Sequence, residues 1–476
     1  MTTTQRVPLA DAEALRSTIA GSISVKNGAV EILDADRIRA SVIDDLVYTA
    51  VFGEGDVQAA ARWLIRVIAP KLGAFPTSIY ELYMAGGRGV YSHRTAPAIN
   101  VRGLTYDNVQ AILRTARKHD NKIVLFEIAR SEMAYTWQRP GEYASSVLAG
   151  AIKAGWQGPV FIQGDHFQAL RKAYAADPAK EIGIVRDLTK EAIAAGFYNI
   201  DIDASTLVDI NEPDLVKQQE KNYRHTAELT AVVRSVEPEG VTVSVGGEIG
   251  EVGKSNSTVE DLEAFMTGYV PALEAESKKA GRQLPGISKI SVQTGTSHGG
   301  IVLPDGTIKT ISVDFDTLAK LSQAAREQYG LGGAVQHGAS TLPESAFGKF
   351  AEANAIEVHL ATGFQNALLD SDHFPSGLRD RMYAWLADKR AEERKEGETD
   401  AQFYYKTRKR VFGPFKQELW NLPAETRTAL MSDLETVYGA IMQHLGVSNS
   451  AAIVDEIVKP VDVAVPMPEG VQAVLG

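Results

Sequence analysis

The sequence predicts an α/β protein built around an eight-stranded (β/α)8 barrel. From about residue 96, short apolar or β-branched runs alternate with longer amphipathic stretches, a pattern typical of βαβ units in a parallel sheet. Eight such units follow one another over roughly 270 residues, close to the size of a closed barrel. An open dinucleotide-binding sheet would carry a glycine-rich loop after its first strand, and VRGLTYD at 101–107 is not such a loop.

The elements of the barrel are predicted from their apolar spacing. Helices with apolar residues at helical spacing are expected within 106–119, 186–196, 259–277 and 315–330. The eight expected strands span residues 96–100, 122–128, 159–164, 198–203, 241–246, 287–295, 333–338 and 356–362.

Two helical segments are expected to flank the barrel. Residues 1–90 hold three amphipathic stretches separated by Gly and Pro, and we interpret them as an N-terminal helical extension. Residues 91–370 form the predicted barrel domain. Residues 371–476 are charged and helical in pattern, which indicates a C-terminal helical extension packed on the barrel.

Composition narrows the classes of function. The formal net charge is -11 and no strongly basic segment precedes residues 389–410, which argues against a nucleic-acid partner. No stretch approaches the length of a membrane span, and the N-terminus lacks the pattern of a signal peptide, so we expect a cytoplasmic protein without a membrane partner. Because the chain has no cysteine, a transition metal must bind to His, Asp or Glu.

Histidines gather at the ends of the predicted strands, where a barrel builds its active site. His166, His298, His337 and His359 follow or lie in the third, sixth, seventh and eighth strands. A single histidine at a strand end is more often structural than a ligand. Three imidazoles at His166, His298 and His337, however, predict an open zinc site with positions left for substrate oxygens.

Other strand-end residues suggest acid–base and phosphate-binding roles. Asp165 precedes His166 and is either a proton-transfer group or a partner that orients a histidine. The runs Gly299-Gly300 and 338–341 follow late strands, where barrels often bind phosphate through backbone N–H groups.

Several motifs resemble those of the class II fructose-bisphosphate aldolase family over roughly residues 96–366. They occur in the family's order, and GTSHG followed by HGAS is a specific pair. Some segments, such as FEIARSEMAYT and QGDHF, are more similar to the Z-type subunit of tagatose-bisphosphate aldolase. The motifs are PAINVRGLTYDNVQAILRTA, GDH, NIDIDAS, GGEIG, GTSHGG and HGASTLP.

The resemblance implies roles for individual residues. The histidines of GDH, GTSHG and HGAS would bind Zn²⁺, and Asp165 would exchange a proton with the hydroxyl at the bond that is cleaved. Glu251, in the loop after the fifth strand, is the candidate acid/base for the enediolate carbon, with an exposed loop glutamate as the equal alternative. Asp203 and Glu248 match carboxylates near the metal, and the phosphate-loop positions, beside which the family often binds K⁺ or Na⁺, are Gly299, Gly338 and Ser340.

The implied activity is that of a lyase: reversible aldol cleavage of fructose 1,6-bisphosphate to dihydroxyacetone phosphate and glyceraldehyde 3-phosphate through a zinc-stabilised enediolate. Such an enzyme serves glycolysis and gluconeogenesis, and family members are usually homo-oligomers. The expected partner is therefore a small sugar phosphate. Tagatose bisphosphate or another ketose phosphate is the alternative substrate, and a non-catalytic partner subunit is the alternative role.

The sequence departs from the family pattern after the eighth strand. Where the family has Asn-Ile-Asp-Thr-Asp, this chain has His359-Leu360-Ala361-Thr362-Gly363. Thr362 keeps its place, and His359 is expected to contact the substrate where the Asn does. Arg and Lys residues between 379 and 410 are candidates for a second phosphate contact, but their spacing selects none of them, and for most of them we favour the alternative of a solvated basic face.

Overall fold

Eight parallel strands close into a barrel in the computed structural model, which describes residues 6–26, 28–250, 255–295, 301–305, 307–309 and 312–476. Pairing of the third barrel strand with the fourth, and of the eighth with the first, closes the sheet. The predicted (β/α)8 fold is thereby confirmed. The strands are β4 (Ala96–Asn100), β5 (Leu125–Ala129), β6 (Gly158–Gln168), β7 (Asn199–Asp203), β8 (Ser244–Glu248), β9 (Lys289–Val292), β12 (Ala334–Gln336) and β13 (Glu357–Leu360).

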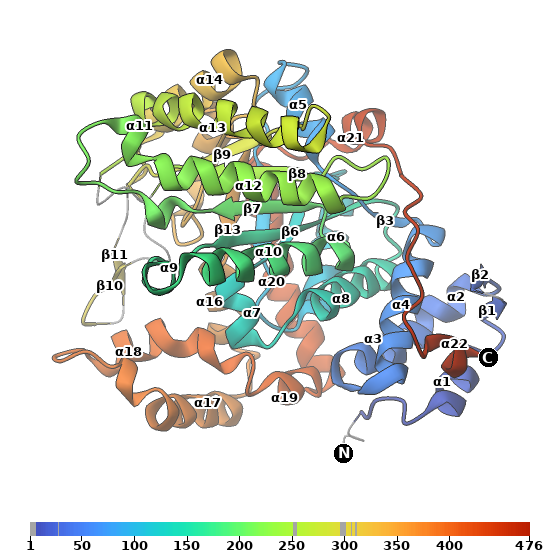
Figure 1. Cartoon of the computed structure of the whole chain (residues 1–476). Coiled ribbons are helices and arrows are strands. Elements are labelled where there is room, and N and C mark those ends of the chain that lie inside the picture. The colour runs from blue at the N-terminus through green and yellow to red at the C-terminus, as the bar shows by residue number, and fades with distance from the viewer. Residues whose placement is uncertain (1–5, 27, 251–254, 296–300, 306, 310–311) are drawn as a thin grey trace.

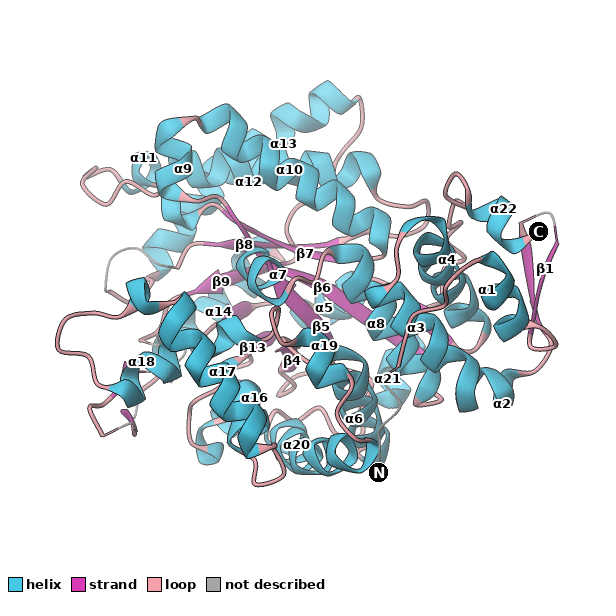
Figure 2. Ribbon diagram, turned by 90° about the horizontal axis from the view of Figure 1, so that it is seen from below, coloured by secondary structure: helices cyan, strands magenta, loops and turns pink. Residues whose placement is uncertain are grey.

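Helices surround the sheet, as Figure 2 shows from below. Their ends are fixed locally: the Thr258 hydroxyl accepts from the Asp261 N–H at the start of α13, and Gly281 ends that helix with a φ of 68°. The main covering helices are α6 (Thr105–Lys118), α8 (Pro140–Lys153), α10 (Pro178–Ala195), α12 (Glu220–Val236), α13 (Val259–Ala280), α14 (Phe315–Tyr329) and α16 (Thr362–Asp370). Shorter helices are α7 (Arg130–Thr136), α9 (Arg171–Ala176), α11 (Leu215–Gln218) and α15 (Gly348–Glu352).

The barrel strands are buried on both faces, but their inner face is polar. In β7, Ile200 and Ile202 belong to the apolar core, while Asn199, Asp201 and Asp203 make hydrogen bonds and ion pairs with residues of other strands or of their own loop. Because side chains alternate along a strand, the two sets point to opposite faces. The strand NIDID thus supplies apolar packing outward and carboxylates inward.

The N-terminal segment packs against the side of the barrel. Helices α3 and α4 both contact α8, and the strand β3 (Ala74–Pro76) pairs with the start of β6. The segment is helical, as its apolar spacing predicts, but it also contains the strand β3 and the hairpin β1–β2, which that spacing does not predict. The other elements are α1 (Ala12–Ile19), β1 (Ile23–Lys26), β2 (Ala29–Ile32), α2 (Ala35–Arg37), α3 (Ile43–Phe52), α4 (Gly55–Lys71) and α5 (Tyr80–Gly87).

The C-terminal segment wraps two sides of the barrel (Figure 1). Helix α20 packs on α6 and α16, and the end of the chain returns to α1 and α4, where Arg16 donates to the Val474 carbonyl at 2.9 Å. The helices are α17 (Ser376–Lys389), α18 (Asp400–Thr407), α19 (Lys416–Trp420), α20 (Ala424–His444), α21 (Ala451–Ile457) and α22 (Val471–Leu475), with the 3-10 turn η5 (Arg408–Val411) between α18 and α19.

A small hairpin after β9 meets this segment. It consists of β10 (Ile301–Val302) and β11 (Ile308–Lys309). The side chains of Gln402 and Thr399 donate to the carbonyls of Val302 and Pro304, at 2.9 and 3.1 Å. The C-terminal segment therefore reaches the loops that follow the barrel strands. Across the described ranges, no helix is long and apolar enough to span a membrane.

Candidate metal and substrate site

The third barrel strand is irregular where it carries the GDH motif. Its register with β7 shifts between Gly164 and Phe167, and His166 has a φ of 41°. A bulge adds a residue to one strand and changes the direction of the side chains beside it. Asp165 and His166 consequently both reach the same cluster, with 3.7 Å between His166 Nε2 and Asp165 Oδ1.

Three imidazole rings lie together at the carboxyl ends of the strands. The ring centroids of His166 and His337 are 4.3 Å apart, and those of His337 and His359 are 4.0 Å apart. His166 and His359 are further from each other, at 6.5 Å. His337 thus stands between the other two rings.

Two further carboxylates face the other nitrogen of His166. Its Nδ1 lies 3.0 Å from Asp203 Oδ2 and 3.1 Å from Glu248 Oε2. Asp203 is itself fixed, because its carboxylate accepts hydrogen bonds from Ser205 and Gln168. A carboxylate held in this way orients the imidazole and directs the opposite nitrogen toward Asp165.

The charges around His166 favour its protonated form in the absence of a metal. Burial lowers the pKa of His166, but the charges of Asp165 and Glu248 and the hydrogen bond that the ring donates to Asp203 outweigh burial and raise it. Burial and the charge of Asp203 raise the pKa of Glu248 to about 7. The cluster therefore carries an excess of acceptors that a cation can satisfy.

Asp165 is held in place from the first barrel strand. The Asn100 side-chain amide, at the end of β4, donates to Asp165 Oδ2 at 2.8 Å. Burial raises the pKa of Asp165, whereas the nearby charges of His166 and His359 lower it below its ordinary value. The Asp165 side chain is thus an ionised carboxylate in a buried setting.

His359 is buried among acidic residues of the barrel interior, and its predicted contact with the substrate stays a prediction. It is 4% exposed, with Nδ1 3.0 Å from Glu127 and 3.2 Å from Asp165, and Nε2 2.5 Å from Glu357. Burial lowers the pKa of His359, but the charges of Glu127 and Glu357 outweigh it and raise the pKa. The ring therefore links the mouth to a charged network inside the barrel.

Lys289 forms the centre of that internal network. Its ammonium donates to Asp201 at 3.0 Å, to Glu357 at 2.5 Å and to Gln163 at 2.9 Å, and all of these residues are buried. Burial lowers the pKa of Lys289, while Asp201 and Glu357 raise it above its ordinary value. The lysine is therefore a charged partner for the carboxylates.

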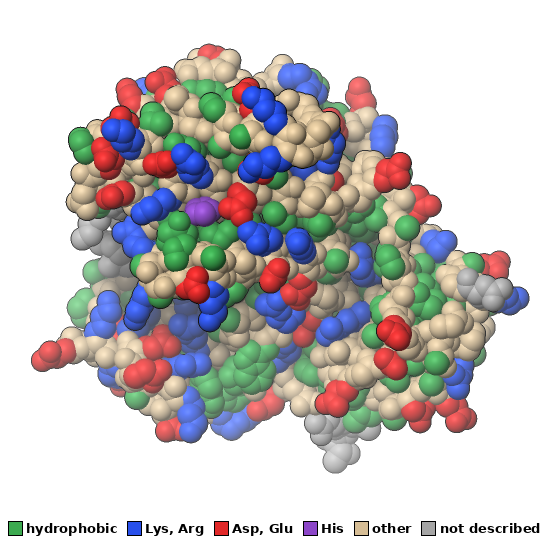
Figure 3. All heavy atoms as spheres, viewed as in Figure 1, with side chains coloured by type: hydrophobic (Ala, Val, Ile, Leu, Met, Phe, Trp, Pro, Cys, Tyr) green, Lys and Arg blue, Asp and Glu red, His purple; other side chains and the backbone are tan. Residues whose placement is uncertain are grey.

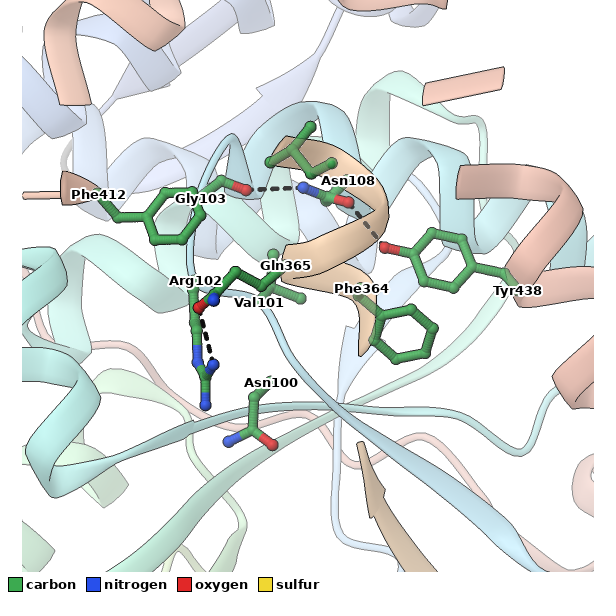
Figure 4. Close-up of a pocket in the computed structure, with 10 residues that line it drawn as sticks. Asn100, Val101, Arg102, Gly103, Asn108, Phe364, Gln365, Phe412 and Tyr438 are labelled. Carbon is green, nitrogen blue, oxygen red and sulfur yellow. Dashed lines mark hydrogen bonds between the residues drawn. The ribbon is translucent and has the colours of Figure 1, made fainter. Parts of the chain in front are cut away.

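A second polar group surrounds the end of β4, next to Asp165. Glu132 accepts from Asn100 at 2.8 Å and from Arg102 Nε at 2.7 Å, and Arg102 Nη1 reaches Gln365 at 2.9 Å. Thr362 accepts from the same Nη1 at 3.4 Å. Asn100, Arg102 and Gln365 also line a pocket beside this strand end, in which Figure 4 shows the side chains of Asn100 and Arg102 on the same side.

The predicted site residues fall into three groups. His166, His337 and Asp165, with Asp203, Glu248 and His359, form one cluster. Gly338 (φ 72°) and Ser340 follow β12, and the Ser340 hydroxyl accepts from the Gly363 N–H at 3.1 Å, which places this loop next to Thr362. His298, Glu251 and Gly299 lie outside the described residues, so their predicted roles stay predictions.

Several residues of this site were not predicted from the sequence. Asn100 is the last residue of the first barrel strand and Arg102 lies in the loop after it, where barrels place functional residues. Glu127, Lys289 and Glu357 lie within apolar strands, and a charged residue inside an apolar run is the signal that would have found them.

The cluster suits a divalent metal by its donor chemistry. Ligand atoms of Asp165, His166 and His337 all lie within 4.8 Å of one another, as do those of His166, Asp203 and Glu248. Imidazole and carboxylate donors are the ligands of zinc sites without cysteine. The residues present therefore fit the metal that the sequence predicts.

Comparison with known proteins identifies a family and several structures of similar fold. Residues 91–413 match the family described as class-II fructose-bisphosphate aldolase, and no curated protein matches the chain. Among solved structures, the fructuronate-tagaturonate epimerase UxaE from Cohnella laeviribosi is 14% identical, with a TM-score of 0.54 over 91% of this chain and 90% of that chain.

Two other solved structures match this chain at low identity. A probable tagatose 6 phosphate kinase from Sinorhizobium meliloti 1021 is 17% identical, with a TM-score of 0.51 over 77% of this chain and 95% of that chain. A fructose-bisphosphate aldolase from Campylobacter jejuni is 19% identical, with a TM-score of 0.44 over 78% of this chain and 94% of that chain. Since the family match covers more than half of the residues, this chain belongs to the class II fructose-bisphosphate aldolase family.

Proposed function

We propose that the protein is a zinc-dependent aldolase that reversibly cleaves a ketose phosphate, with fructose 1,6-bisphosphate as the first candidate. Membership of the family supports this proposal. The observation that carries it is the juxtaposition of His166, His337 and Asp165 at the carboxyl ends of the strands, where barrel enzymes act.

The metal would be held by His166 and His337, with His298 as the predicted third ligand. A bound divalent ion supplies Lewis-acid polarisation of a carbonyl oxygen. Asp203 and Glu248 hold the Nδ1 side of His166, so that Nε2 is directed toward Asp165. The protein's own contribution is thus to orient the ligands and to limit access of water.

Asp165 is the proposed proton-transfer group. In the cleavage direction its carboxylate takes the proton from the hydroxyl on the carbon whose bond breaks, and in the condensation direction it returns that proton. The Asn100 amide holds Oδ2 at 2.8 Å, and the side chain is almost fully buried. A fixed, desolvated base of this kind suits transfer to a bound hydroxyl.

Metal analysis combined with a cleavage assay tests the proposal. The purified chain is expected to carry about one zinc ion at the imidazole cluster, and a chelator is expected to abolish cleavage until zinc is restored. His337→Ala should lose both the metal and the activity. His444→Ala is the matched control, because His444 pairs with Glu344 on the surface, at 3.0 Å.

Cleavage that persists in chelated His337→Ala protein would overturn the metal-dependent mechanism. Retention of zinc without cleavage of any member of a ketose phosphate panel would overturn the aldolase activity alone. The same panel distinguishes fructose 1,6-bisphosphate from tagatose bisphosphate.

Epimerisation of a ketose is a second candidate, favoured by one observation. Glu248 and Asp165 face opposite nitrogens of His166, and two acid–base groups at one centre can remove and return a proton on opposite faces of a carbon. Incubation with ketoses in D₂O, followed by NMR, separates the two reactions. Epimerisation gives a deuterated isomer with an intact carbon chain, whereas cleavage gives an aldehyde and a triose.

A further inference from the structure

The turn η5 is anchored next to the strand ends of the barrel. The Gly413 N–H donates to the Tyr135 carbonyl at 3.1 Å, and the Phe412 ring packs against Gly103, in the loop after β4. Arg408 is tied to Asp370 by two hydrogen bonds, at 2.6 and 2.9 Å. The residues between these anchors therefore have a fixed place beside the candidate site.

Lys409 differs from the cations around it in having no acidic partner. Arg408 pairs with Asp370, Arg410 with Glu393, and Lys406 with Glu398. Lys409 is half-buried, and no hydrogen bond or ion pair joins it to any residue in the described ranges. Its ammonium lies 5.8 Å from the centre of the Tyr135 ring.

Tyr135 connects Lys409 to the candidate site. The Tyr135 hydroxyl donates to Glu132 at 3.4 Å, and Glu132 holds both Arg102 and Asn100. Asn100 in turn holds Asp165. Lys409 thus lies over the ring of a tyrosine whose hydroxyl donates to the glutamate that holds Arg102, and Asn100 joins that glutamate to the proposed base.

The Arg102 guanidinium also has one nitrogen, Nη2, that is available for a further hydrogen bond. Its Nε and Nη1 bind Glu132, Thr362 and Gln365, but Nη2 donates to no atom in the part of the chain that the structure describes. A guanidinium with one free nitrogen beside a free ammonium is a favourable arrangement for a phosphate or carboxylate.

The charges in this group do not balance. Arg102, Lys409 and Arg410 bring three positive charges, and Glu132 and Glu393 bring two negative ones. Burial lowers the pKa of Lys409, and the charges of Arg102 and Arg410 lower it further. An anion bound here would remove the repulsion between the cations. Figure 3 shows Lys and Arg side chains in a recess between the α9–α10 layer and the α17–α18 layer.

We propose that Lys409 and Arg102 bind the anionic terminal group, phosphate or carboxylate, of the ketose substrate. The C-terminal segment would then complete the substrate site of the barrel, rather than only cover its side. This inference rests on the proposed function for the identity of the ligand as a ketose, but the anion site itself is testable without turnover.

Titration calorimetry with two small probes tests the site on the zinc-loaded full-length chain. The probes are glycerol 3-phosphate and glycerate, which carry a terminal phosphate and a terminal carboxylate. Lys409→Met should weaken binding of the matching probe by about tenfold or more, since a hydrogen bond to a charged group is lost. Lys409→Arg should keep most of the affinity.

Lys389→Met is the control, because it removes the same charge from an exposed side chain of the same segment. Its probe affinity should equal that of the unchanged protein. In Lys409→Met, the Met side chain retains the apolar stem over Tyr135. Lys409→Gln is a second neutral variant, to be used if Lys409→Met does not fold.

The outcomes separate this inference from the proposed function. Equal probe binding in Lys409→Met and the unchanged protein, or no binding of either probe to the unchanged protein, overturns the anion site. Lys409-dependent binding without cleavage of any ketose phosphate leaves the anion site in place and overturns the aldolase proposal. A preference for glycerate over glycerol 3-phosphate would identify the substrate as a sugar acid.

Discussion

The chemistry of the site depends on single residues whose surroundings change their behaviour. Asp165 is an ordinary carboxylate by sequence, yet Asn100 fixes one of its oxygens and two imidazoles face the other. Burial alone would favour its protonated form, and the imidazole charges reverse that preference. The neighbours of Asp165 therefore determine whether it can act as a base.

Asp165→Asn should lower kcat for ketose phosphate cleavage by about 10²- to 10⁴-fold, because proton transfer is lost. The amide is similar in size to the carboxylate, so zinc content and folding should stay unchanged. Steady-state kinetics and metal analysis of the same preparation check this. Cleavage at the unchanged rate would remove Asp165 from its proposed role.

Lys289 shows how a buried charge at one residue supports the barrel interior. Lys289→Met should lower the free energy of unfolding by about 3–5 kcal/mol, because the buried carboxylates of Asp201 and Glu357 would lose the ammonium that pairs with both of them. Urea unfolding measures the change. Lys279→Met, which removes an exposed pair with Glu276, should change it by only about 0.5 kcal/mol.

If Lys289→Met unfolds at the same urea concentration as the unchanged protein, the internal network is not a source of stability. Adding Glu357→Gln to Lys289→Met should recover part of the loss, since one of the uncompensated carboxylates is removed.

At the scale of elements, close contact between the η5 turn and the loop after β4 positions Lys409. A Cβ at Gly103 would lie 2.3 Å from the Phe412 ring, so only glycine permits this approach. The β6 bulge has a comparable role, because it directs both Asp165 and His166 into the cluster. In both places a backbone irregularity sets the direction of functional side chains.

Gly103→Ala should lower the free energy of unfolding by about 1–3 kcal/mol, since Phe412 must move to admit the methyl group. It should also weaken probe binding at Lys409. Gly183→Ala is the control: a Cβ there meets no atom within 4 Å, and we expect a gain of about 0.4–1 kcal/mol. Urea unfolding of both variants is the measurement, and equal effects would contradict the close packing.

At the scale of the whole molecule, the two chain ends hold each other. Trp63 donates to the Val465 carbonyl at 3.1 Å and Arg16 to that of Val474, while Val471, Val474 and Leu475 are buried against the N-terminal helices. The last turn of the chain thus belongs to the core of the N-terminal segment.

Val471→Ala should lower the free energy of unfolding by about 2 kcal/mol, through lost apolar burial and a residual cavity. Gln472→Ala, at the neighbouring exposed position, should change it by less than about 0.5 kcal/mol. Urea unfolding followed at the N-terminal Trp63 would report this, and a stable Val471→Ala variant would show that the tail only rests on the surface.

The barrel can be predicted from the amino-acid pattern, because each strand and helix depends on local apolar periodicity and on capping residues. The sequence motifs also indicated the family and predicted that His166, His337 and Asp165 belong to one active site. Apolar periodicity, capping residues and motifs each involve residues that are close together in the sequence, so they are visible without the structure.

How distant residues meet depends on the folded structure. That His359 lies beside Glu127 and Asp165, and that Lys409 lies over the Tyr135 ring, depends on contacts between segments about 200 residues or more apart. Burial and electrostatic interactions act through space, so a pattern along the chain identifies the charged residue but not its partner.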